Sequence, residues 1–237
     1  GVNSLNKNKM INNDKIELFN GIALLKDDQC ICRFIRESGR LDHDQNILPL
    51  VLEYIPEGGT VFDIGAFIGD TTLAYANKVG EKGNIYAFEP NTNAYECLSY
   101  NLHKNDATVY FSKFALGSTI KTAKINNVET NNGMNYLTDG NDITVITLNE
   151  FYVNNEISRI DFIKIDVEGY ELDVLIGGKE TINKFKPTML IEINDTTLAR
   201  QNVSRQQIFE WLTENNYIYR NIYKNQGLND SQLDIIC

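Results

Sequence analysis

The stretch Thr60–Ala74, TVFDIGAFIGDTTLA, decides the predicted fold. Its apolar first half is typical of a buried strand that ends at Asp63, and a glycine turn follows from Gly65 to Gly69. The residues from Asp70 onward have the pattern of a helix, predicted over Asp70–Val79. This order of strand, tight turn and helix start is typical of folds that hold a nucleotide-like ligand.

The turn itself is the first predicted binding element. Glycine has no Cβ, so the backbone can bend sharply and a ligand can approach it closely. We expect the free N–H groups of Gly69, Asp70 and Thr71 at the helix start to face that ligand. The turn residues predicted to bind it are Gly65, Ala66, Gly69, Asp70 and Thr71.

The charge at the end of this strand indicates the kind of ligand. The spacing from Asp63 through Gly65 to Gly69 differs from the G-x-G-x-x-G of dinucleotide folds, and a carboxylate there would repel a pyrophosphate. A cationic nucleoside that carries an amino acid fits better, and S-adenosylmethionine has both a sulfonium and an ammonium. Glu89 ends the next predicted strand, twenty residues after Gly69, where an acid can accept the ribose hydroxyls.

Composition narrows the class of protein. The chain has 237 residues and a formal net charge of −10, which argues against nucleic acid as a partner. No apolar run is long enough for a membrane helix, and the first residues lack the apolar centre of a signal peptide, so we expect a cytoplasmic protein without a membrane partner. Four cysteines without zinc spacing are interpreted as free thiols: Cys30, Cys32, Cys97 and Cys237.

The chain is expected to form one α/β domain at 46–237 after an N-terminal extension at 1–45, whose start is expected to fray. Within the extension, Gly21–Ile35 is predicted to form a β-hairpin whose turn contains Lys26. The third strand of the domain is predicted at Thr108–Leu116, with Ala115 beside an adenine site. Residues 118–146 are expected to insert antiparallel strands around a mobile loop. Further strands are predicted at Ile160–Asp166, Pro187–Asn194, Tyr217–Tyr223 and Gln232–Cys237. The last two are expected to form an antiparallel hairpin at the sheet edge. Further helices are predicted at Asn46–Tyr54, Asn91–Lys104, Gly169–Leu175 and Ser204–Asn215.

Acidic residues end several of the predicted strands. In open α/β sheets the ligand binds outside the carboxyl ends of the strands. Strand alternation places Lys164 and Asp166 on one face at such an end. We therefore expect four carboxylates from four strands to meet at one edge of the sheet: Asp63, Glu89, Asp166 and Glu192.

Four segments resemble one family. VFDIGAFIGDTTL, YAFEP, ALG after the third strand and, most specifically, IKIDVEGYELDVLIGG are similar to the FkbM family of S-adenosylmethionine-dependent methyltransferases, over roughly Ile47 to Tyr219. The resemblance implies a Rossmann-like class I methyltransferase fold, with a mostly parallel seven-stranded sheet whose last strand is antiparallel. It implies methyl transfer to oxygen, commonly on sugars or natural-product hydroxyls. The predicted cofactor site consists of the turn residues together with Asp63, Glu89, Pro90, Ala115 and Asp166.

A hydroxyl acceptor must lose its proton, so a base or a metal near the methyl group should assist. The catalytic candidates are Asp166, His43 and Glu192. Asp166 and Glu192 could bind Mg²⁺, or Asp166 could hold the methionine ammonium while Glu168 and Glu171 fix the next turn. The metal-free alternative is favoured because the sequence shows no clear third ligand. His43, between two aspartates, could be a base or a surface histidine.

The sequence therefore predicts an S-adenosylmethionine-dependent O-methyltransferase that acts on a hydroxyl of a sugar, glycan or glycosylated small molecule. Two alternatives within the fold are a non-catalytic binding protein and a methyltransferase for a protein or another small molecule. A dinucleotide-dependent oxidoreductase is disfavoured by Asp63. Weaker candidates for the acceptor site are Arg40, Asn135 and Tyr136. The oligomeric state is left open, with a dimer as one option.

Overall fold

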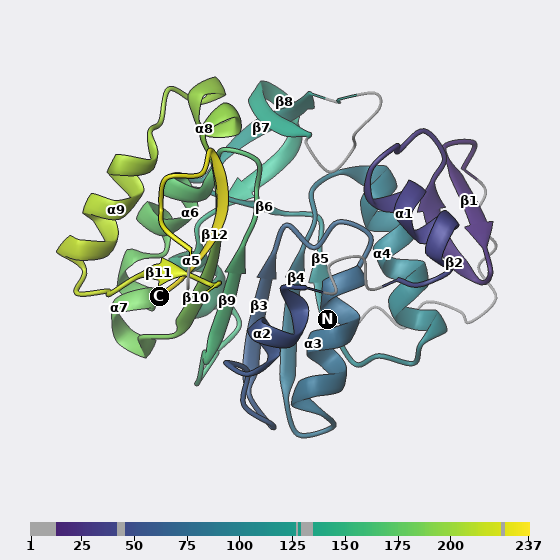
Figure 1. Cartoon of the computed structure of the whole chain (residues 1–237), viewed down its shortest axis with the longest axis horizontal. Coiled ribbons are helices and arrows are strands. Elements are labelled where there is room, and N and C mark those ends of the chain that lie inside the picture. The colour runs from purple at the N-terminus through teal and green to yellow at the C-terminus, as the bar shows by residue number, and fades with distance from the viewer. Residues whose placement is uncertain (1–12, 42–45, 127, 129–134, 224–225) are drawn as a thin grey trace.

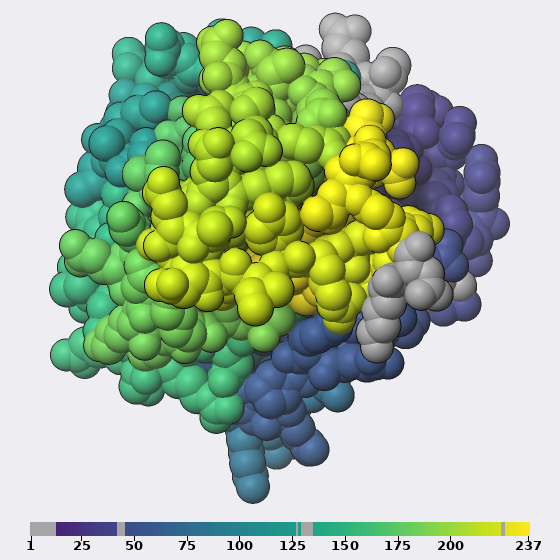
Figure 2. All heavy atoms as spheres, turned by 60° about the vertical axis from the view of Figure 1, so that its left-hand side comes forward, coloured from purple at the N-terminus to yellow at the C-terminus, as the bar shows by residue number. Residues whose placement is uncertain are grey.

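A computed structural model describes residues 13–41, 46–126, 128, 135–223 and 226–237. Its main sheet is mostly parallel, and among the described strands only the two pairings of β12, with β10 and with β11, are antiparallel there. In spatial order the strands are β11 (Arg220–Asn221), β12 (Gln232–Ile236), β10 (Thr188–Asn194), β9 (Phe162–Ile165), β3 (Thr60–Ile64), β4 (Asn84–Phe88) and β5 (Tyr110–Ser112). The predicted class I arrangement with an antiparallel last strand is confirmed. Figure 2 shows the C-terminal segment, in yellow, on the outer surface beside α9.

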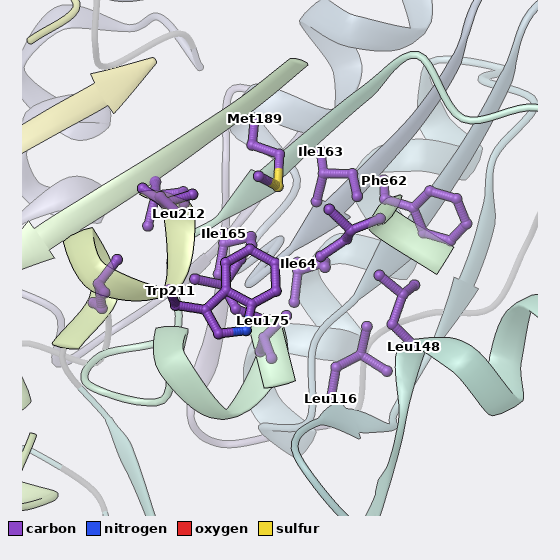
Figure 3. Close-up of a cluster of buried hydrophobic side chains, with 14 of the residues drawn as sticks. Phe62, Ile64, Leu116, Leu148, Ile163, Ile165, Leu175, Met189, Trp211 and Leu212 are labelled. Atoms are coloured by element: carbon purple, nitrogen blue, oxygen red, sulfur yellow. The ribbon is translucent and has the colours of Figure 1, made fainter. Parts of the chain in front are cut away.

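Helices cover both faces of this sheet (Figure 1). One face packs against α2 (Leu48–Leu52), α3 (Asp70–Val79) and α4 (Thr92–Lys104). The other packs against α5 (Leu148–Asn154), α6 (Glu171–Gly177), α7 (Lys179–Phe185) and α9 (Arg205–Glu214), while α8 (Asp195–Arg200) follows β10. Figure 3 shows Trp211 and Leu212 of α9 against side chains of the sheet. Because helices bury both faces, the central strands β3 and β9 are mainly apolar, and each carries one charged residue, Asp63 and Lys164, near its carboxyl end.

The N-terminal extension differs from its prediction. The hairpin consists of β1 (Ile16–Phe19) and β2 (Ile22–Leu25), and it turns at Asn20 and Gly21 rather than at Lys26. Both turn residues have positive φ, 50° and 81°, which suits a two-residue hairpin loop. The second apolar run is instead helix α1 (Ile31–Ser38).

The side chain of Asp28 explains why this second run is helical. Its Oδ1 accepts hydrogen bonds from the N–H groups of Cys30, at 3.2 Å, and Cys32, at 2.8 Å. These bonds satisfy donors that a helix start leaves without an intrahelical partner. The residues predicted to fray, at the start of the extension, lie outside the described part of the chain.

The predicted third strand is divided between two sheets. Its first half is β5, at the edge of the main sheet, and its second half is β6 (Ala115–Leu116), which pairs with β8 (Tyr136–Ile146). β8 also pairs antiparallel with β7 (Lys121–Asn126), so the predicted antiparallel insertion is confirmed. Its predicted mobile loop falls on residues 127 and 129–134, outside the described residues.

Two further sequence predictions can be compared with the structure. All four cysteines are free thiols, as expected. Across the residues that the structure describes, none of the helices is both long and apolar enough to pass through a bilayer.

Candidate functional site

A cavity of about 450 Å³ lies at the carboxyl ends of β3, β4, β9 and β10. This volume is within the range of small-molecule sites. Most of the predicted site residues line it: Gly65, Asp70, Thr71, Glu89, Pro90, Ala115, Asp166 and Glu192. His43 lies outside the described residues, and Arg40 is exposed and does not line the cavity.

Three predicted ligand contacts lie behind the cavity wall instead: Asp63, Ala66 and Gly69. The N–H of Gly69 donates to the carbonyl oxygen of Ala66 at 2.9 Å, and the N–H of Ala66 donates to that of Phe88 at 3.0 Å. The prediction that the Gly69 N–H faces the ligand is therefore wrong. This N–H group is instead hydrogen-bonded within the turn itself.

The two glycines of the turn are needed for contacts within the protein. Gly65 has φ +88°, and a Cβ there would lie 1.8 Å from the carbonyl oxygen of Asp166. Gly69 has φ +89°, and its Cβ would lie 2.8 Å from Cδ1 of Leu98 in α4. The sequence analysis attributed the need for glycine at these positions to the close approach of a ligand. The structure shows that the loop after β9 and helix α4 already occupy that space.

Lys164 links two of the strand-end acids. It is opposite Asp63 in the parallel ladder of β3 and β9, and its Nζ lies 3.7 Å from Asp63 Oδ1 and 3.1 Å from Asp166 Oδ2. It also donates to the carbonyl oxygen of Gly65 at 3.0 Å. Burial alone would lower the pKa of Lys164, but the carboxylates of Asp166 and Asp63 outweigh that effect and raise it well above its usual value.

Asp63 therefore contacts other groups of the protein beneath the cavity surface rather than a ligand. It is fully buried, and its Oδ2 accepts a 2.6 Å hydrogen bond from the Thr72 hydroxyl in α3. Lys164 stands between it and Asp166. We infer that Asp63 positions Lys164, and that Lys164 in turn positions Asp166 at the cavity.

Glu89 lies at the end of β4 with each carboxylate oxygen already bonded to the backbone. Oε1 accepts from the Asn91 N–H at 2.8 Å, and Oε2 accepts from the Phe67 N–H at 2.9 Å. Burial raises the pKa of Glu89 to about 7 despite these two bonds. Each oxygen retains a further lone pair, so the side chain can still accept hydroxyl groups from a ligand in the cavity.

Three carboxyl groups meet where β9 and β10 border the cavity. Oxygens of Asp166, Glu168 and Glu192 lie within 4.8 Å of one another. The negative charge of Asp166, followed by burial, raises the pKa of Glu192 to about 10. Burial, followed by Asp166, raises the pKa of Glu168 to about 8. This cluster should bind positive charge, either an ammonium and sulfonium pair or a divalent cation.

In the metal-free alternative, Glu168 and Glu171 were both expected to fix the turn after β9. Glu171 does so, because its Oε1 accepts from the N–H groups of Val167 and Gly169, both at 3.1 Å. Glu168 has φ +56° and lines the cavity. The third carboxylate that seemed missing from the sequence is therefore present in the structure.

The remaining walls come from segments distant in sequence. Asn135 and Tyr136 of the insertion line the cavity, as does Gln232 of β12, whose Nε2 donates to Glu192 Oε1 at 2.8 Å. Asn135 Oδ1 accepts from the Val128 N–H, and its buried Nδ2 has no hydrogen-bond partner within the part of the chain that the structure describes. Alternation in β12 could have indicated Gln232, but nothing in the sequence showed that β12 pairs with β10.

Comparisons with known proteins agree with this geometry. A family profile described as Methyltransferase FkbM domain matches residues 63–219. The hexuronic acid methyltransferase AglP of Haloferax volcanii is 29% identical over 137 residues, which cover 56% of this chain and 56% of that protein. The chain thus matches little more than half the length of this curated relative.

Two solved structures share the fold. The methyltransferase FkbM of Methylobacillus flagellatus superposes with a TM-score of 0.52 at 16% identity, over 76% of this chain and 44% of that one. A SAM-dependent methyltransferase of Aquifex aeolicus gives 0.50 at 14% identity, over 83% and 93%. At these identities the similarity concerns the fold alone. Because the family profile covers more than half of the sequence, the chain belongs to the FkbM methyltransferase family.

Proposed function

We propose that the protein transfers the methyl group of S-adenosylmethionine to a hydroxyl group of a sugar, glycan or glycosylated small molecule. One observation carries the proposal: a cavity at the carboxyl ends of parallel strands is lined by a buried acid, Glu89, after β4 and by the cluster of Asp166, Glu168 and Glu192 after β9 and in β10. The family membership and the sugar-modifying relative support the same activity.

The donor fits the cavity by charge and by polarity. Glu89 would accept the ribose hydroxyls, and the apolar side chains of Phe114, Ala115 and Leu116 would contact the adenine. The carboxyl cluster would then hold the methionine end, whose ammonium and sulfonium are cationic. Because these charges favour the ionised carboxyl groups, bound donor should lower the raised pKa values of Glu168 and Glu192.

The acceptor would lie between the cluster and the insertion. Asn135 Nδ2 is a buried donor that pairs with none of the described residues, and a hydroxyl oxygen of the acceptor could accept its hydrogen bond. The carboxyl groups around it disfavour an anionic group near the methyl. We therefore propose a neutral hydroxyl as the methylated group, with a hexuronic acid acceptor placing its own carboxylate away from this cluster.

Transfer would be an in-line displacement at the methyl carbon, so most of the rate acceleration would come from positioning. Asp166 and Glu192 are the proposed acceptors of the hydroxyl proton, and His43 stays a candidate base. The Mg²⁺ alternative remains a proposal, now with Asp166, Glu168 and Glu192 as its ligands. A cytoplasmic location and the lack of nucleic-acid partners likewise stay proposals.

Turnover can be tested by measuring release of S-adenosylhomocysteine with a panel of methyl pyranosides, sugar nucleotides and hexuronic acids. We expect at least one sugar to stimulate release, and Asp166→Asn to lower kcat about 100-fold, the order expected for loss of acid–base assistance. The control Asp142→Asn, an exposed change on β8, should leave kcat unchanged. Donor binding without stimulated release by any sugar in the panel would favour the non-catalytic alternative.

A further inference from the structure

A second cavity, of about 770 Å³, lies at the β5 edge of the main sheet. Strand alternation places four of its lining side chains on the face that α5 covers: Tyr86 and Phe88 of β4, and Tyr110 and Ser112 of β5. Helix α5 contributes Glu150, and β8 contributes Thr144 and Ile146. None of these residues except Phe88 lines the cavity described above.

Aromatic rings form one wall of this second cavity. Tyr110 stacks on Tyr86 with ring centroids 5.1 Å apart and planes at 15°, and Tyr86 stacks on Phe62 at 4.9 Å. Tyr110 ends this row and is 42% exposed. A flat aromatic surface that is half open to solvent is suited to an apolar face of a bound ring.

Two buried polar atoms border the same space. Ser112 Oγ and Glu150 Oε2 are both buried, and neither has a hydrogen-bond partner among the described residues. A buried polar group left unpaired is unfavourable, so an occupant that pairs with both atoms would bind more tightly than an apolar one. Among the described residues that line this cavity there is no lysine or arginine, which disfavours a phosphate or another anion.

We propose that the second cavity binds a sugar ring other than the ring that is methylated. A pyranose has an apolar C–H face, which would stack on Tyr110, and hydroxyl edges, which would pair with Ser112 and Glu150. Phe88 and Phe114 line both cavities, so the two sites are adjacent. Assigning this ring to the acceptor glycan rests on the proposed function, whereas its binding does not.

The test is saturation-transfer difference NMR on the full chain with methyl β-glucopyranoside, methyl β-galactopyranoside and methyl α-mannopyranoside. We expect transfer to the ring protons of at least one sugar. The signal should fall at least fivefold in Tyr110→Ala and Ser112→Ala, and should persist in Tyr110→Phe, which retains the ring. The control Phe34→Ala removes an aromatic side chain of similar exposure, 37%, from α1 and should change nothing.

Two results would overturn the proposal: no transfer to any of the sugars, or transfer that survives in folded Tyr110→Ala and Ser112→Ala. Circular dichroism establishes that the variants fold. S-adenosylhomocysteine binding is measured on the same samples. Its absence would refute the proposed function while leaving the sugar result intact, so the two failures are distinguishable.

Discussion

Replacing Lys164 by methionine should destabilise the protein severely, because the change leaves Asp63 without its cation. Asp63 is fully buried, its Oδ1 has no hydrogen-bond partner among the residues that the structure describes, and Lys164 Nζ lies 3.7 Å from that oxygen. The Thr72 hydroxyl would remain as its main donor. Removing one member of a buried ion pair typically costs about 3–5 kcal/mol, because the other charge stays buried and uncompensated.

For a chain of this size that loss corresponds to a fall in Tm of about 6–20 °C. Urea unfolding at pH 7 would measure the free energy directly. The double variant with Asp63→Asn should recover part of the loss, with a coupling energy above about 1 kcal/mol. The deficit of Lys164→Met should be larger at pH 8 than at pH 5, since an uncompensated buried carboxyl group is stabilised by protonation and destabilised when it ionises.

The matched control is Lys78→Met, which removes an exposed lysine near the end of α3 and should cost less than about 0.5 kcal/mol. If Lys164→Met loses less than about 1 kcal/mol, or if it shows no coupling to Asp63→Asn, then Lys164 does not compensate Asp63. The inferred positioning of Asp166 through this pair would then be wrong.

Three further predictions follow from the site. Gly65→Ala should lower the free energy of unfolding in urea by more than about 3 kcal/mol, because the added Cβ would meet the Asp166 carbonyl. Gly80 has a similar positive φ but open space around it, so Gly80→Ala should lower it by only about 1–2 kcal/mol. Equal losses in the two variants would contradict the steric argument. S-adenosylhomocysteine affinity should be constant above pH 7, because burial raises the pKa of Glu89 to about 7, and should fall up to about tenfold per pH unit below it. Below that pH the Glu89 carboxyl group is protonated, and it must lose this proton before the ribose hydroxyls can donate to it. Glu89→Gln should remove that dependence in a calorimetric pH series. Turnover should be unchanged by EDTA if the cluster around Asp166 holds the donor's ammonium, and loss of turnover that Mg²⁺ restores would establish the metal alternative.

Sequence reasoning located the site because its signals are local. The turn after Asp63 and the acid that ends β4 follow from the order of strand, glycines and helix. The convergence of Glu89, Asp166 and Glu192 follows from the rule that parallel strands present their carboxyl ends at one edge. These residues line one cavity, as predicted.

What the sequence could not show depends on contacts between distant segments. The glycine at position 65 was assigned to ligand approach because its true neighbour, the carbonyl of Asp166, is 101 residues further along the chain. Glu168 joins the carboxyl cluster only because its backbone adopts φ +56°, which a glutamate rarely does. The division of the third predicted strand depends on the pairing of Ala115 and Leu116 with β8, which periodicity does not encode.

Three short helices were not predicted from the sequence. α5, α7 and α8 have six or seven residues each, which leaves few positions for an apolar period. α5 could have been identified from Thr147, whose side chain accepts from the Glu150 N–H as an N-cap. That helix matters because Glu150 contributes to the second cavity.

The central claim is that the cavity holds an adenosyl donor through Glu89, and isothermal titration calorimetry with S-adenosylhomocysteine tests it most directly. We predict binding of one molecule per chain, weakened at least tenfold by Glu89→Gln and unchanged by Glu81→Gln, an exposed matched control. Absence of binding to the folded wild-type protein, or equal affinity in all three proteins, would contradict the claim.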